Sequence, residues 1–72
     1  MVLELLRKFF AEAMRQAGRD DLAKWAEDAP GEAVKTAARV VMRALGFGKV
    51  DEQSIRDVER VRDQAVAAGG AA

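Results

Sequence analysis

The sequence predicts an all-α fold, a small bundle of three to four short helices, from two observations. Apolar residues recur at the three- and four-residue spacing of one helix face through most of the chain. Glycine and proline interrupt this pattern between the helical stretches, where helices end and begin. We therefore expect a single helical domain over residues 1–68 and a disordered tail over residues 69–72.

The first expected helix, residues 2–17, is the most hydrophobic part of the chain. Its apolar residues cover about half of the helix circumference, more than one small neighbouring helix would cover. Gly18 suits the left-handed position that follows a helix. The apolar side could be core, a dimer seam or a membrane-surface face, and Glu4 and Glu12 make the membrane reading the weakest because such helices are strongly basic. The candidate seam for a second copy or a partner consists of four apolar residues: Leu3, Leu6, Phe9 and Phe10.

Two further helices are expected in the middle of the chain. Residues 20–28 begin with two carboxylates at the positive end of the helix dipole, and Trp25 should be buried and anchor this helix on its neighbours. The next helix should begin at Pro30, with Ala29 as its N-cap, and end at Gly46.

The last expected helix follows Asp51, whose side chain should cap it. Val50 and Ile55 have the spacing of a hydrophobic staple across that cap. Phe47 should fold back on the last turn of the preceding helix. The apolar stripe of the last helix is narrow, so it covers its neighbours on one side only.

The residue types present argue against an enzyme and against a cofactor or metal centre. The chain has no Cys and no His, which excludes disulfides, thiolate and imidazole metal ligands and the usual proton carrier at neutral pH. Ser54 and Thr36 are its only hydroxyl nucleophiles, and no imidazole is present to activate them. The acids Glu59 and Asp63 lie near several arginines, so we expect them to form salt bridges rather than a metal site.

The third expected helix carries Lys35, Arg39 and Arg43 at four-residue spacing, so the three cations share one face. The whole chain has no net charge, but residues 31–49 carry four cations and one acid, a net of +3. The segments on either side are acidic, and their carboxylates, or those of a partner, are the expected neutralising groups. The alternative is that the three cations contact DNA phosphates.

One resemblance supports the DNA alternative. Leu22-Ala23-Lys24-Trp25, followed by the turn at Ala29-Pro30-Gly31 and by Val34, resembles the Leu-Ala, turn, Val pattern of helix-turn-helix regulators. It covers about a fifth of the chain, with Asp28 near an apolar position of that pattern and Val34 one position late. The resemblance implies a DNA-binding regulator that reads its site with the third helix.

The interrupted apolar start of the chain, with Glu4, Arg7 and Lys8, predicts neither a secretory signal nor a membrane span, so the expected compartment is the cytoplasm. We expect a small, non-enzymatic bacterial or phage regulatory or adaptor protein that acts by protein–protein interaction. A chain this short gains stability from self-association, so a homodimer is expected. The protein partner is not identified by the sequence, and nucleic acid is the alternative partner.

Overall fold

The computed structural model describes residues 2–69, and four helices make up this part of the chain: α1 (Val2–Gln16), α2 (Asp20–Asp28), α3 (Gly31–Gly46) and α4 (Glu52–Ala67). No strand occurs among these residues, which confirms the all-α prediction. Of the expected tail over 69–72, Gly69 alone is described; it is exposed directly after α4, and the other three residues lie outside the described range.

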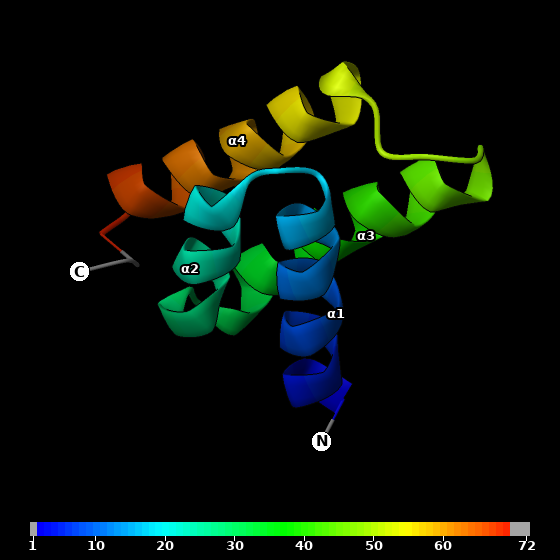
Figure 1. The fold of residues 1–72 in the computed structure, drawn as a ribbon. Helices are drawn as coiled ribbons and strands as arrows, with labels where there is room; N and C mark the ends of the chain where they lie inside the picture. Colours follow the sequence, from blue (N-terminus) through cyan, green and yellow to red (C-terminus); the bar gives the residue numbers. More distant parts are fainter. Residues whose placement is uncertain (1, 70–72) are drawn as a thin grey trace.

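The helices form two hairpins in two layers. In Figure 1, α1 and α2 lie side by side, α3 passes behind them, and α4 runs across the top. The helix α1 packs on both α2 and α3, α3 also packs on α4, and α2 touches α4 only briefly. The smallest dimension of the molecule, 18 Å, is close to two helix diameters of about 10 Å each, as two layers require.

The core consists mainly of small side chains. Among the described residues thirteen apolar residues are buried, and seven of these are alanines. The large, fully buried side chains are Phe10, Met14, Leu22, Val34, Val41 and Val58. Alanines at the crossing points let the helix backbones approach closely. The contact between the two layers is therefore made mostly by side chains no larger than a methyl group, with six larger ones among them.

The turn between α1 and α2 has the geometry expected from Gly18. Its φ of 78° is in the left-handed region, where glycine has no steric penalty. The Arg19 N–H donates to the Met14 carbonyl at 2.8 Å, and the Gly18 N–H donates to the Arg15 carbonyl at 3.0 Å. These two bonds form a Schellman motif, which satisfies the last free carbonyls of α1. The helix ends one residue earlier than expected.

The start of α3 differs from the prediction by one residue. Pro30 has a ψ of 145° and is the N-cap rather than the first helical residue, and its carbonyl accepts from the Val34 N–H at 3.1 Å. Ala29 is extended as expected, but it is buried in the core instead of capping α3. Gly31 then lies directly under the Leu3 side chain, since a Cβ added at this glycine would be 3.0 Å from a Leu3 methyl.

The start of α4 confirms the predicted cap. The Asp51 side chain accepts from the Ser54 N–H and hydroxyl, both at 2.9 Å, and these bonds hold the pKa of Asp51 below its usual range. Val50 and Ile55 are half-buried against the core, as a staple requires. The prediction for Phe47 is wrong: its side chain is 87% exposed. It lies four residues after Arg43, on the outward side of α3, so it does not reach the covered face of that helix.

Two hydrogen bonds from the Arg7 side chain hold α1 against the C-terminal end of α2. The Arg7 Nη1 donates to the carbonyl oxygens of Ala26 at 2.6 Å and Ala29 at 2.8 Å. Both carbonyls lie at the C-terminal end of α2, where backbone oxygens have no partner within the helix and the dipole is negative. A guanidinium from another helix therefore caps α2, whose own last turn has no basic residue.

The indole of Trp25 packs against the core at the α1–α2 contact. Its ring lies edge-on to Phe10, with centroids 6.0 Å apart and an interplanar angle of 76°. The side chain is half-buried, so the expected anchoring role is met with part of the ring at the surface. Its Nε1 is buried and has no hydrogen-bond acceptor among the described residues.

Replacing Trp25 with Ala should lower the free energy of unfolding by about 3 kcal/mol, the lower end of the range for large aromatic side chains because part of the ring is exposed. Urea titration followed by circular dichroism measures this loss. Trp25→Phe is the matched control; it keeps an aromatic edge near Phe10 and should cost less than half as much. A loss below about 1 kcal/mol for Trp25→Ala would contradict the anchoring role.

Candidate binding surfaces

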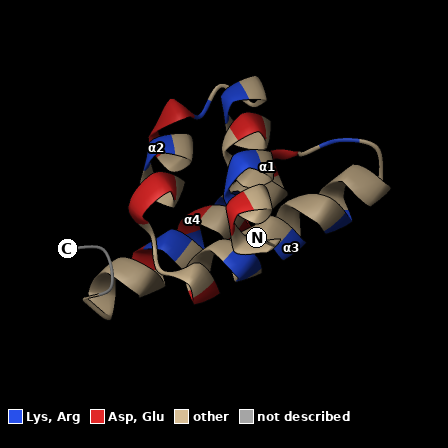
Figure 2. Cartoon of the chain, turned by 90° about the horizontal axis from the view of Figure 1, so that it is seen from below, with Lys and Arg blue, Asp and Glu red and all other residues tan. Residues whose placement is uncertain are grey.

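The three cations predicted as a binding site, Lys35, Arg39 and Arg43, lie along the outer side of α3, and we call them the basic stripe. Figure 2 shows basic residues along this helix, on the face turned away from α2. Arg39 and Arg43 are exposed and Lys35 is half-buried. Within residues 2–69 no carboxylate forms an ion pair with any of the three. The expected neutralisation by acids of the flanking segments is therefore not found within this range, and the basic stripe is open to an external anion.

Five of the eight acids in α2 and α4 form ion pairs with arginines outside the stripe. Glu59 of α4 accepts from Arg19 at 2.7 Å, and Asp63 pairs with Arg62 at 3.1 Å, which confirms the salt bridges predicted for these two acids. Asp51 and Asp57 lie at the Arg43 end of the stripe, since they line a small pocket of about 200 Å³ together with Arg43. The C-terminal end of the stripe thus has acidic neighbours without a direct ion pair.

The predicted seam residues of α1 divide into covered and accessible ones. Phe10 is fully buried within the chain, so it is not available to a partner in this fold. Leu3 lies over Gly31, and Leu6 and Phe9 are half-buried against the core. The apolar arc is wide enough that α2 and α3 cover one part of it and leave the adjacent part open.

The open part of the arc carries residues that the seam prediction did not include. Val2 is 70% exposed and Leu5 is 68% exposed. On α3, Met42 and Leu45 are each 46% exposed. On the helical wheel of α3, Leu45 falls on the apolar face that the sequence predicts, and Met42 falls between that face and the basic stripe.

An apolar groove of about 510 Å³ runs between α1 and the connection from α3 to α4. Phe9 and Ala13 line it from α1, and Leu45 and Val50 line it from the opposite side. Two opposite charges also border it, Glu12 on α1 and Lys49 on the connection. Of the exposed apolar residues named above, Leu45 lines this groove.

The groups that bond-making chemistry would need are engaged in local structure. The Ser54 hydroxyl donates to Asp51 in the cap of α4, and the Thr36 hydroxyl donates to the Glu32 carbonyl at 3.0 Å, one turn earlier in α3. Within the described range no three acidic side chains are grouped closely enough to hold a metal ion. No helix of that range is long and apolar enough to cross a membrane.

An ion-pair network joins the start of α2 to α4. Arg19 donates through Nε and Nη2 to the two carboxylate oxygens of Asp21, both at 3.0 Å, and its Nη2 also contacts Glu59. Arg62 approaches Asp21 from α4 at 3.5 Å. The hydrogen bonds from Arg19 hold the pKa of Asp21 below its usual range, and the two acids raise the pKa of Arg19. Asp21 thus stabilises the contact between α2 and α4 as well as the N-terminal end of the α2 dipole.

Because folding lowers the pKa of Asp21, its carboxylate stabilises the fold above a pH of about 4, and this contribution is lost as the pH falls through the lowered pKa. Asp21→Asn should cost at most about 1 kcal/mol at pH 7, because the pair is half exposed, and should flatten the acid limb of the stability profile. Urea titrations at several pH values measure both effects. Asp20→Asn, at the exposed neighbouring position, is the matched control; an equal effect there would rule out a role for the network.

Comparison with protein-family models, with curated proteins and with solved structures finds no match to this chain. A functional proposal therefore has to start from the two surfaces described above: the basic stripe, which has no ion pair within residues 2–69, and the apolar groove between α1 and the end of α3.

Proposed function

We propose that this chain is a small, non-enzymatic regulatory or adaptor protein of bacterial or phage origin that acts in the cytoplasm by binding another protein. The binding surface is the basic stripe, and the partner presents carboxylates to it. The observation that carries the proposal is the absence of any ion pair to Lys35, Arg39 or Arg43 among residues 2–69, although the same fold pairs four other arginines.

Protein carboxylates fit the basic stripe better than a nucleic-acid backbone does. A protein that binds nucleic acid mainly through phosphates needs a surplus of cations, and this chain has none overall. Asp51 and Asp57 lie next to the Arg43 end of the stripe, where they would repel a phosphate chain. A protein surface can place its acids on the cations and leave these two positions free.

DNA binding is the second candidate function. It is favoured by the same unpaired cations and by the order of α2, a short connection and α3, which resembles helix-turn-helix regulators. The connection is the two residues Ala29 and Pro30, shorter than the three- to four-residue turn typical of that motif. In this case α3 would be the helix in the DNA groove.

Self-association completes the proposal. The chain has a small, alanine-rich core and an open apolar groove, and a homodimer would bury the exposed side of α1. Each dimer would then carry two basic stripes, so that a partner with repeated acidic sites is bound more strongly than by one chain.

The triple change of Lys35, Arg39 and Arg43 to Gln separates the two candidate functions. We expect the wild type to show no duplex binding in a gel-shift assay at low salt, and to retain from its host's extract an acidic protein that the triple variant does not retain. Lys24→Gln, an exposed cation of α2, is the control and should behave as wild type. The DNA function would be established instead if the wild type bound duplex DNA at sub-micromolar concentration and the triple variant did not. Salt should then weaken the binding, and the slope of log affinity against log salt concentration should fall by about one unit for each cation removed.

Light scattering coupled to size exclusion should give the mass of a dimer for the wild type at high micromolar concentration. Leu5→Glu should give the monomer mass, because it places a charge in the apolar contact. The control is Val66→Glu on α4, which changes another large exposed apolar residue far from α1 and should leave the dimer intact. A monomeric wild type would refute the homodimer.

A further inference from the structure

Two helix ends project from the body of the molecule and expose apolar side chains. The first turns of α1 carry Val2 and Leu5, and the last turns of α3 carry Met42 and Leu45. Figure 1 shows the start of α1 pointing away from the other helices and the end of α3 extending past α1 on the other side. In each pair the two residues are three positions apart, so the two apolar patches have the same length along their helices.

The projecting ends flank one corner of the molecule. The apolar groove lies in this corner, between α1 and the end of α3, with Phe9 and Leu45 on its two sides. A helix lying alongside α1 in this corner would contact Phe9 and Leu45 together. Its far end would extend along the start of α1, where Val2 and Leu5 are open.

We propose that a second copy of the chain occupies this corner, with its α1 antiparallel to the first α1 and the two copies related by a two-fold axis near Phe9. This inference rests on the homodimer proposed above and gives its geometry. The projecting start of α1 in each copy then covers the projecting end of α3 in the other.

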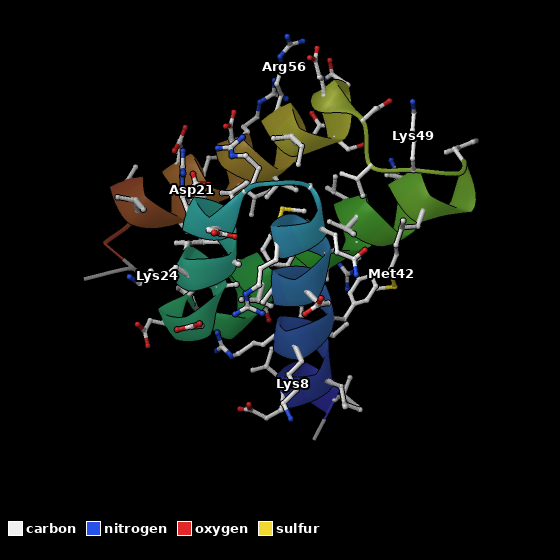
Figure 3. The ribbon with its side chains drawn as sticks, in the orientation of Figure 1. Lys8, Asp21, Lys24, Met42, Lys49 and Arg56 are labelled. Carbon is white, nitrogen blue, oxygen red and sulfur yellow. The ribbon has the colours of Figure 1, made fainter. Side chains whose placement is uncertain are left out.

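The charges beside the apolar side of α1 fit this arrangement. Lys8 and Glu12 lie one turn apart on the edge of the apolar side, and Figure 3 shows Lys8 pointing outward from α1. Their midpoint is residue 10, next to Phe9. In an antiparallel pair centred there, Lys8 of each copy faces Glu12 of the other, so one two-fold axis creates two opposite-charge contacts. Within residues 2–69 Lys8 has no ion pair, and Glu12 has only a 3.7 Å contact to Arg15 and a 3.5 Å hydrogen bond from Gln16.

A second copy fits the corner better than an unrelated helix because the surface is complementary to itself. A two-fold interface uses the same surface on both subunits, so each patch must match a different patch of the same chain. Here Val2 and Leu5 on α1 match the apolar pair near the end of α3. Lys8 matches Glu12, which lies on the same edge of α1. An unrelated apolar helix would use the groove and the apolar side of α1 but would leave Lys8 without a matched acid.

A charge-swap experiment tests this geometry. The variants are Lys8→Glu, Glu12→Lys and the double change Lys8→Glu/Glu12→Lys, with Lys24→Glu as the control, since Figure 3 places Lys24 on the far side of α2. Dissociation constants are measured by sedimentation for each protein alone and for an equimolar mixture of the two single variants. Thermal melting by circular dichroism of every variant checks that α1 still folds.

Each single variant should self-associate about tenfold more weakly than the wild type, because both charge contacts become repulsive. The double variant should regain wild-type association. The mixture of the two single variants should form a heterodimer at least as tight as the wild-type dimer, because all four charges are then matched. This last result does not depend on the stability of either helix, since the same two proteins are measured alone and together.

A wild-type dimer that is unchanged by the single variants, or a mixture that associates no better than its components, would overturn the antiparallel geometry while leaving the homodimer in place. A wild type that stays monomeric would overturn both. If instead Leu5→Glu abolishes the dimer and the mixture gains nothing, the copies meet at the apolar side of α1 in another orientation, which also refutes this inference.

Discussion

The burial of α1 against both α2 and α3 is the contact on which the rest of the structure depends. This helix joins the two layers, and it supplies the two largest fully buried side chains, Phe10 and Met14. Two short helices alone would bury too little apolar area to remain folded, and α2 has only nine residues. With α1 in place, α2 receives the edge of Phe10 on Trp25, and α3 receives Leu3 over Gly31. Because α2 and α3 pack on adjoining parts of α1, the remaining side of this helix is left exposed.

Polar contacts fix the orientation of the short helix α2 at both of its ends. At its C-terminus, Arg7 of α1 donates to two backbone carbonyls, and at its N-terminus Arg19 and Asp21 connect it to Glu59 of α4. Charge-assisted hydrogen bonds to backbone carbonyls are stronger and more directional than apolar contacts. They compensate for the small apolar stripe of α2. The same use of charge explains why the basic stripe differs from the rest of the surface: most other arginines take part in holding the fold together, and those of α3 do not.

The parts of the structure that were predictable from sequence are those decided within a few residues. Gly18 and Asp51 set the ends of helices through local backbone geometry and a side-chain cap, and both were predicted. Pro30 was misplaced by one residue because the burial of Ala29, a tertiary contact, keeps the chain extended there. The burial of Phe10 and the long-range bonds of Arg7 depend on how α1 packs against its neighbours. The exposure of Phe47 follows from its place on the outward side of α3. Periodicity gives the apolar arc of α1 but does not say which part of the arc the neighbours cover.

The alanines at the centre of the fold determine which sequence changes it can tolerate. In a core of large residues most damage comes from truncation, which leaves a cavity. Here seven of the thirteen buried residues have only a methyl group to lose, so truncation removes little. Enlargement is the greater danger, because every added methylene must push two helix backbones apart. Divergent versions of this fold should therefore vary freely on the surface while keeping glycine, alanine or serine where the helices cross, and their common ancestry would be visible in the spacing of small residues rather than in a pattern of large ones.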